Sequence, residues 1–166
     1  MELELAGRVV IVTGGSSGIG LAIAGLFAAE GAHVIVTARR ADPLERAARE
    51  LSKRSPSRVL AIPSDTTVQI QVDRMVEAVL GQHSRIDILV NCAANPSGSL
   101  SPAIEDFDGE ALLKDLNTKV AGYARCARAV VPAMKQQRWG RIINIGGLTG
   151  RSPSLFSGMR NLALCH

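Results

Sequence analysis

Thr13-Gly14-Gly15-Ser16-Ser17-Gly18-Ile19-Gly20 is the stretch that decides the fold we expect for this chain. It follows Arg8–Thr13, a β-branched and nearly continuous apolar run, as expected of a parallel strand covered on both faces. It precedes Leu21–Phe27, which has helical composition, and Gly31, a natural end for that helix. Glycines at a strand–helix junction let the backbone approach a pyrophosphate, while the helix start directs its N–H groups at it. A plain tight turn is the alternative, and the missing lysine after Gly20 excludes a triphosphate-binding loop.

Strands and helices are predicted to alternate along the rest of the chain. The second strand is His33–Thr37, and the later strands are Arg58–Ile62, Ile86–Asn91 and Arg141–Ile145. Asp42 is predicted to cap the second helix, with Pro43 at its first position. The third helix follows Val68 and stops at Gly81, and a polar loop covers Asn95–Pro102. A long fourth helix covers residues 112–134, where Pro132 bends or frays its last turns. This alternation predicts an α/β fold with a parallel sheet and right-handed crossovers.

Four further motifs extend the pattern in chain order. Asp65 follows the third strand, Asn91-Cys92-Ala93-Ala94 ends the fourth, Asn117 lies in the long helix, and Gly140–Ile145 forms the fifth strand. With the TGxxxGxG form of the glycine turn, residues 6–150 resemble the short-chain dehydrogenases/reductases. The resemblance implies a Rossmann-type doubly wound sheet of five strands in the order 3-2-1-4-5, with the C-terminal strands missing. It makes residues 1–166 a single NAD(P)-binding domain, incomplete at its C-terminus.

The resemblance also implies a function and a set of site residues. The family transfers hydride between a nicotinamide cofactor and a carbonyl or alcohol substrate. Carried onto this sequence, Asn117 is the catalytic residue, and the cofactor-binding residues are Gly14, Ser16, Ser17, Gly18, Ile19, Gly20, Arg39, Arg40, Asp65, Thr66, Asn91, Ala93 and Ala94. Structural alternatives stay open for two of them: Asp65 as a cap of the next helix, and Asn91 as a partner of backbone groups at a strand end. A mid-helix asparagine such as Asn117 is harder to explain by structure alone.

The residues after the second strand favour NADP(H) over NAD(H). A dehydrogenase that prefers NAD carries an acid about 20 residues past its glycine motif, which binds the ribose 2′-hydroxyl. Ala38 stands in that place here, followed by Arg39 and Arg40. A guanidinium pairs well with a 2′-phosphate, and the absent carboxylate removes a repulsive charge. The alternative is a pair of solvated surface arginines.

The family's remaining catalytic groups are absent from this sequence. Gly146-Gly147 stands where the family carries its serine, and neither tyrosine nor lysine occurs after Arg141. Two alignments place either Ser157 and Asn161, or Arg160 and Leu164, at the missing Tyr-x-x-x-Lys pair. Tyr123, the only tyrosine, is expected to be a core or interface residue turned away from Asn117. We therefore expect a weakly active or inactive reductase, with a non-catalytic dinucleotide-binding or regulatory module as the alternative.

Composition narrows the remaining classes. The 166 residues carry a net charge of +4 without a basic block, and 3% are aromatic, which argues against nucleic-acid binding. The three cysteines form no CxxC pair, so neither a zinc site nor a disulfide framework is expected. The acidic start and the absence of a long apolar run predict a cytoplasmic protein without a membrane partner. The resemblance implies homodimers or tetramers, which we do not expect this short chain to form, and its small-molecule substrate stays unknown.

Overall fold

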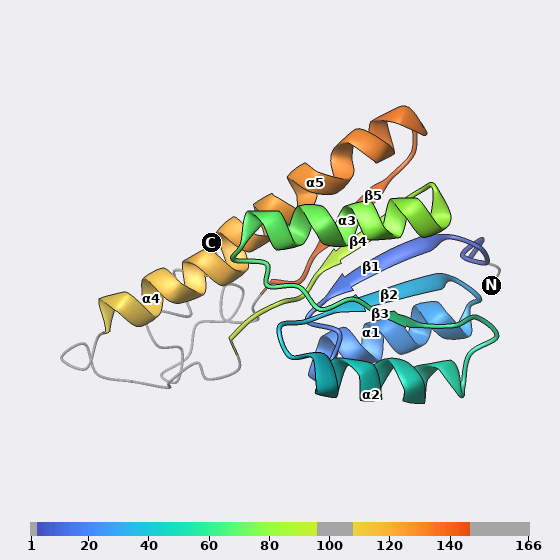
Figure 1. Ribbon diagram of the computed structural model, residues 1–166, viewed down its shortest axis with the longest axis horizontal. Coiled ribbons are helices and arrows are strands. Elements are labelled where there is room, and N and C mark those ends of the chain that lie inside the picture. Colours follow the sequence, from blue (N-terminus) through green and yellow to red (C-terminus); the bar gives the residue numbers. More distant parts are fainter. Residues whose placement is uncertain (1–2, 96–107, 147–166) are drawn as a thin grey trace.

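The computed structural model describes residues 3–95 and 108–146, and the parallel sheet in this part confirms the predicted fold class. Five strands pair in the order β3-β2-β1-β4-β5, all parallel, with helices on both faces (Figure 1). The strands are β1 (Val9–Thr13), β2 (His33–Thr37), β3 (Leu60–Ala61), β4 (Ile88–Asn91) and β5 (Arg141–Asn144). The helices are α1 (Gly18–Ala29), α2 (Ala41–Ser52), α3 (Gln69–His83), α4 (Gly109–Leu116) and α5 (Gly122–Gln136), with a π-helical segment (Asn117–Ala121) joining α4 to α5.

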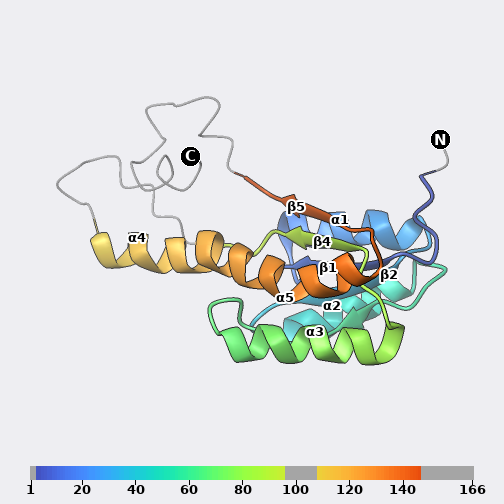
Figure 2. The same cartoon turned by 90° about the horizontal axis from the view of Figure 1, so that it is seen from above.

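Alternate residues of the central strands build two separate cores, because successive side chains point to opposite faces of a sheet. On one face, Val10 and Val12 pack with Ala24 of α1 and Leu44 of α2. On the other face, Ile11 packs against buried apolar side chains of α3 and α5. Figure 2 shows α3 and α5 together on one side of the sheet and α1 on the other. Since both faces are covered, β1 and the last four residues of β2 are fully buried.

The end of α1 confirms the role expected of Gly31. Its φ of +79° lies in the left-handed region that favours glycine. The Gly31 N–H donates to the Ala28 carbonyl at 3.1 Å, and the Ala32 N–H donates to the Phe27 carbonyl at 3.1 Å. These two bonds form a Schellman motif, which satisfies carbonyls at the helix end. The chain is thereby turned directly into β2.

Two helix boundaries differ from the predictions. Arg40, not Asp42, is the N-cap of α2, so Asp42 lies within the first turn, where its charge is favourable near the helix start. Helix α3 continues through Gly81 to His83 and is capped by Ser84 with a left-handed φ of 58°. An isolated glycine costs only about 1 kcal/mol within a helix, and tertiary packing outweighs it here.

The predicted long helix is present but not uniform. It is interrupted by the π-helical segment, and α5 continues past Pro132 to Gln136. Most of the predicted polar loop (96–102) lies outside the described residues. Among the helices of the described part, none is long and apolar enough to cross a membrane.

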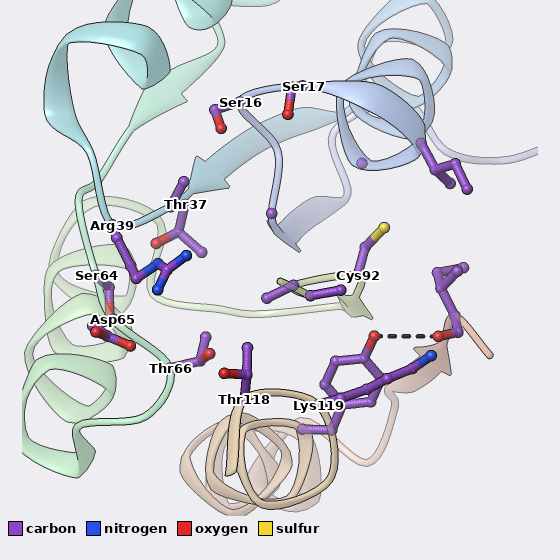
Figure 3. Close-up of a pocket in the computed structure, with 18 of the residues that line it drawn as sticks. Ser16, Ser17, Thr37, Arg39, Ser64, Asp65, Thr66, Cys92, Thr118 and Lys119 are labelled. Atoms are coloured by element: carbon purple, nitrogen blue, oxygen red, sulfur yellow. Dashed lines mark hydrogen bonds between the residues drawn. The ribbon is translucent and has the colours of Figure 1, made fainter. Parts of the chain in front are cut away.

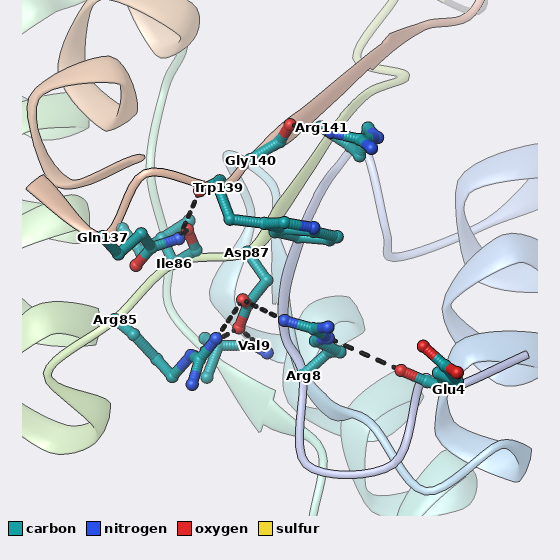
Figure 4. Close-up of polar contacts among 10 residues, drawn as sticks. All are labelled: Glu4, Arg8, Val9, Arg85, Ile86, Asp87, Gln137, Trp139, Gly140 and Arg141. Atoms are coloured by element: carbon teal, nitrogen blue, oxygen red, sulfur yellow. Dashed lines mark hydrogen bonds and ion pairs between the residues drawn. The ribbon is translucent and has the colours of Figure 1, made fainter. Parts of the chain in front are cut away.

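A buried carboxylate ties the amino ends of the central strands together. Asp87, with no exposed side chain, accepts hydrogen bonds from the Val9 N–H at 2.9 Å, from Arg8 at 3.2 Å and from Arg85 Nε at 2.8 Å. Figure 4 shows Asp87 between the two arginines, with the Trp139 ring beside Arg8. The Arg8 guanidinium carbon lies 4.2 Å from the Trp139 ring centroid, within cation–π distance. This network holds β1 and β4 in register, and it lies at the end of the strands opposite the glycine turn.

Candidate dinucleotide site

The glycine turn is held close to the ends of β2 and β4. The Gly14 and Gly15 N–H groups donate to the Thr37 carbonyl at 2.8 and 3.2 Å. Gly14 has a φ of +70°, and a Cβ there would lie 3.0 Å from the Cys92 carbonyl oxygen. At Gly20, a Cβ would lie 2.9 Å from the Gly14 carbonyl carbon. Both positions therefore require glycine for packing, and the turn lies against the ends of β2 and β4.

The start of α1 faces this turn without a side-chain cap. Ser17 is the N-cap, yet its hydroxyl makes no capping hydrogen bond, and the first turn carries no acid. The first N–H groups of a helix lack intrahelical partners and bear partial positive charge. Such an end can receive the phosphates of a dinucleotide. The local geometry thus fits the role expected of the glycine turn.

Thr13 joins the two strands at which the strand order reverses. Its hydroxyl donates to the Val90 carbonyl at 3.4 Å and accepts from the Cys92 and Ala93 N–H groups at 3.0 and 3.1 Å. The chain after β4 is thereby drawn over the end of β1. In doubly wound folds, this reversal point opens the crevice that binds ligands.

A pocket of about 520 Å³ opens at that point. Its described lining residues come from the ends of β1, β2, β3, β4 and β5 and from the helical stretch after α4. They are Gly14, Ser16, Ser17, Ile19, Gly20, Thr37, Ala38, Arg39, Arg40, Ser64, Asp65, Thr66, Cys92, Ala93, Ala94, Thr118, Lys119, Tyr123, Ile145 and Gly146. Eleven of the fourteen expected site residues are among them, and Gly18, Asn91 and Asn117 are not. Sequences far apart in the chain therefore meet in one cavity.

Two buried hydroxyls in the pocket lack partners among the described residues. The Thr37 and Ser64 hydroxyl oxygens are buried and make no hydrogen bond there. Both residues line the pocket on the side of β2. Buried polar groups are normally satisfied, so these hydroxyls fit a polar ligand between them. Together with the glycine turn and the uncapped start of α1, the residues present suit a dinucleotide.

Arg39 and Arg40 reach the same side of the pocket. Both are exposed, and both line the cavity just after β2. Figure 3 shows the Arg39 guanidinium in the space between the end of β2 and Asp65. Neither arginine forms an ion pair with a carboxylate in the part of the chain that the structure describes. Their charges are therefore available to an anionic ligand.

Asp65 does not cap α3, which removes the structural alternative considered for it. Its carboxylate accepts from the Thr67 N–H at 2.9 Å and the Thr67 hydroxyl at 2.8 Å, which closes a local turn. The N-cap of α3 is Val68, which has no capping side chain. Thr66 follows in the pocket wall, and its carbonyl accepts from Arg125 at 3.4 Å. The turn holds Asp65 at the edge of the pocket, and one of its carboxylate oxygens accepts both hydrogen bonds from Thr67.

Asn91 lies behind the pocket wall. Its side-chain amide donates to the Asn144 side chain at 2.9 Å and to the Tyr123 carbonyl at 3.3 Å. It therefore links β4 to β5 and α5, and the one backbone group to which it donates belongs to α5 and not to a strand end. Its buried side-chain oxygen has no partner among the described residues.

Asn117 is not among the residues that line the cavity. It begins the π-helical segment, is exposed, and its side-chain oxygen accepts from Arg125 at 2.8 Å. Arg125 also donates to the Asn117 carbonyl at 3.3 Å. One arginine thus holds both acceptors of Asn117, so this side chain stabilises the irregular helix in this structure.

Tyr123 corrects the expectation of a core or interface residue. It lines the pocket, and its hydroxyl donates to the Ile145 carbonyl at 3.2 Å. Burial raises the pKa of Tyr123 well above its ordinary value, so it remains a neutral phenol. The π-helical segment changes the helical phase after Asn117, which uniform helix geometry does not anticipate.

Several pocket residues were not expected from the sequence. Thr37, Ser64, Thr118 and Lys119 belong to this group, as does Tyr123. Thr37 and Ser64 could have been found because Thr37 ends a predicted strand and Ser64 lies two residues after another, on the same edge of the sheet as the glycine turn. No sequence pattern indicated that Lys119 lines the pocket, apart from its place two residues after Asn117. Gly147, Ser157, Arg160 and Asn161 lie outside the described residues. Two cysteines, Cys92 and Cys126, are free thiols, and the described part holds no cluster of metal-ligating side chains.

Comparisons with known proteins agree on one family. A family model for short chain dehydrogenase matches residues 8–159. An uncharacterized oxidoreductase of Bacillus subtilis is 38% identical over 143 residues, which are 86% of this chain and 54% of that protein. L-sorbose reductase from Gluconobacter frateurii, solved with NADPH and L-sorbose, is 36% identical with a TM-score of 0.86, covering 98% of this chain and 60% of that one.

A structure solved with the other nicotinamide cofactor is similar as well. An NAD⁺-bound xylitol dehydrogenase is 25% identical with a TM-score of 0.88, covering 97% of this chain and 61% of that one. The chain thus spans 54–61% of the length of these three relatives.

Proposed function

The chain belongs to the short-chain dehydrogenase family, and from this premise we propose that its pocket binds NADP(H) in preference to NAD(H). The observation that carries the proposal is the position of Arg39, which lines the pocket after β2 without a carboxylate partner among the described residues. The L-sorbose reductase neighbour was solved with NADPH, which supports the same assignment. In this proposal residues 1–166 act as one nucleotide-binding domain.

The physical basis is the charge around the end of β2. Ala38 offers no carboxylate to a ribose 2′-hydroxyl, so the usual attraction for NAD(H) is missing. A 2′-phosphate brings a negative charge that a guanidinium can bind with two parallel hydrogen bonds. Asp65 is the only acid among the described lining residues, and one of its oxygens is already bonded to Thr67. The pocket is therefore electrostatically suited to the phosphorylated cofactor.

The protein's own part in the chemistry is to hold and orient the cofactor. When bound, NADP(H) supplies or accepts the hydride. The helix start at Gly18 would bind the pyrophosphate, and the Thr37 and Ser64 hydroxyls would bond to polar atoms nearby. Gly14 and Gly20 allow the tight turn that would bring the backbone close to the phosphates. Hydride transfer to or from a small carbonyl or alcohol substrate is the activity we propose for the whole protein.

Isothermal titration calorimetry tests the preference. We expect the unmodified chain to bind NADPH at least tenfold more tightly than NADH, since a hydrogen bond to a charged group contributes about 1.5–3 kcal/mol. Arg39→Ala and Arg40→Ala should each reduce that ratio. Arg46→Ala is the matched control, because Arg46 is exposed on α2 and does not line the pocket. Equal affinities for NADPH and NADH in the unmodified chain would refute the proposal.

A specific observation favours a second candidate, a dinucleotide-binding module without turnover. Residues 142–166 contain neither tyrosine nor lysine, and Gly147 stands at the family's serine position. General acid catalysis contributes about 10²–10⁴-fold to the rate of such reactions. The residues at the family's positions in this chain cannot supply it. We propose that the 166-residue chain has trace activity at most. A cytoplasmic location is part of the same proposal, because its cysteines form no disulfide pattern.

A further inference from the structure

Lys119 is a positively charged pocket residue that is not among the site residues expected from the sequence. It is partly buried in the π-helical segment and lines the cavity. Its ammonium group forms no ion pair with any residue in 3–95 or 108–146. Arg39 lines the same cavity from β2, and Figure 3 shows Arg39 and Lys119 at opposite ends of it. Two separated positive charges therefore act on a ligand that fills this pocket.

The sheet topology identifies which half of a dinucleotide each charge meets. The glycine turn lies at the end of β1, in the middle of the sheet, and would receive the pyrophosphate. The nucleoside bearing the 2′-phosphate would extend toward β2 and Arg39. The second nucleoside must then extend toward β4 and β5, where Cys92, Ile145 and Gly146 form the wall. Lys119 lies on this second half, which is where the nicotinamide ring belongs.

The residues on either side of Lys119 are anchored, and no carboxylate among the described residues pairs with its ammonium group. The preceding residue, Thr118, is buried, and its hydroxyl donates to the Lys114 carbonyl at 2.9 Å. One turn later, Tyr123 is anchored through its hydroxyl to Ile145. The described lining of this half includes no acid. Burial raises the pKa of the Cys92 thiol, and the positive charge of Lys119 partly offsets this effect. The charge of Lys119 therefore acts at the end of β4.

We propose that Lys119 makes the pocket bind the reduced nicotinamide cofactor more tightly than the oxidised one. This inference rests on the proposed NADP(H) function and specifies which redox form the site prefers. NADPH and NADP⁺ share the same adenine, phosphates and riboses, and they differ by one positive charge on the nicotinamide ring. Attraction of Lys119 to the phosphates is therefore common to both, whereas repulsion of the ring applies only to NADP⁺. The ratio of the two dissociation constants isolates that repulsion.

The expected size follows from Coulomb's law near a protein surface. Two unit charges roughly 10 Å apart, at an effective dielectric constant of about 20, change an equilibrium by about twofold with full screening by physiological salt and by about fifteenfold without screening. We expect the NADP⁺ to NADPH ratio of dissociation constants to exceed one in the unmodified chain. It should fall by about two- to fifteenfold when the charge is removed.

The experiment is a calorimetric titration of the full 166-residue chain with NADPH and with NADP⁺ at fixed salt and pH. Lys119→Met and Lys119→Gln remove the charge with side chains of similar length, and Lys119→Arg retains it. Lys114→Met is the matched control, because Lys114 is exposed on α4 and outside the pocket. Circular dichroism melting of each variant identifies any neutral variant that fails to fold, and the other neutral variant then gives the result.

We expect both neutral variants to lower the ratio, while Lys119→Arg and Lys114→Met keep it. An unchanged ratio in a folded neutral variant would overturn the inference, yet NADPH binding would still stand. An equal fall in the Lys114→Met control would also overturn it, because the effect would then be one of net charge. Failure of the unmodified chain to bind either form would overturn the proposed function and this inference with it.

Discussion

Replacing Asp87 with asparagine should destabilise the sheet at the end opposite the pocket. The Asp87 side chain is fully buried and accepts from one backbone N–H and two arginines. Asparagine retains one acceptor oxygen and no charge, so it cannot serve both arginines and Val9. Hydrogen bonds to charged groups contribute about 1.5–3 kcal/mol each, but Arg8 and Arg85 are 27% and 44% exposed and regain water. We therefore expect a loss of about 2–3 kcal/mol in the free energy of unfolding.

Urea denaturation of Asp87→Asn at pH 7, followed by circular dichroism, measures this loss. Glu45→Gln is the matched control, since its ion pair with Arg49 on α2 is exposed, and it should change stability by less than about 0.5 kcal/mol. A change at Asp87 no larger than that of the control would refute the reasoning.

The same carboxylate should govern stability in acid. Burial acts to raise the pKa of Asp87, but hydrogen bonds from Arg85 and Val9 outweigh it and hold the pKa below its ordinary value near 3.8. A depressed folded-state pKa contributes stability that is present above the unfolded value and is lost as pH falls through the folded one. Asp87→Asn should therefore flatten the stability profile below about pH 4. An unchanged acid profile would contradict this assignment.

Three further predictions concern the turn, a histidine pair and turnover. Gly20→Ala should weaken NADPH binding at least tenfold, because its Cβ would lie 2.9 Å from the Gly14 carbonyl carbon. Gly81→Ala is the matched control: this position in α3 has open space around it, so alanine should raise the free energy of unfolding by about 0.5–1 kcal/mol. Burial, and then the neighbouring His33, lower the pKa of His83 from its usual 6.5. The free energy of unfolding, measured by urea titration, should therefore be highest above about pH 7 and fall as the pH drops below 6.5. His83→Gln should remove that slope. The unmodified chain should oxidise NADPH at no more than trace rates with a panel of ketones and quinones, and steady turnover at ordinary enzyme rates would show that an unassigned residue supplies the proton.

The sheet was predictable because its signals are local and repeated. His33–Thr37 was bounded correctly, and the strand order followed from the resemblance carried by the glycine turn. The start of α2 was not bounded correctly, because Asp42-Pro43 has the form of an N-cap followed by the first helical residue, whereas the helix begins at Ala41. A cap depends on backbone angles at one residue, and neighbouring residues of similar propensity shift it easily. Tertiary packing likewise carried α3 past Gly81.

The pocket was predictable on the side of the glycine turn and less so on the side of α5. Ser16, Ser17 and Arg39 follow directly from the motif and from the strand that precedes them. Tyr123 was misplaced because its direction depends on the π-helical segment, which adds a residue to the turn and has no simple sequence signature. Asn117 shows the converse, since a residue expected at the reaction centre here bonds to Arg125. Side chains after an irregular helix cannot be assigned to a face from spacing alone.

A crystal structure of the chain with NADPH bound tests the central claim most directly. The account predicts the pyrophosphate on the N–H groups at the start of α1, between Ser17 and Gly20. It predicts the 2′-phosphate within hydrogen-bonding distance of Arg39 or Arg40, and the nicotinamide on the side of β4 and β5, near Lys119. A nucleotide bound elsewhere, or one whose 2′-phosphate points away from both arginines, would contradict it.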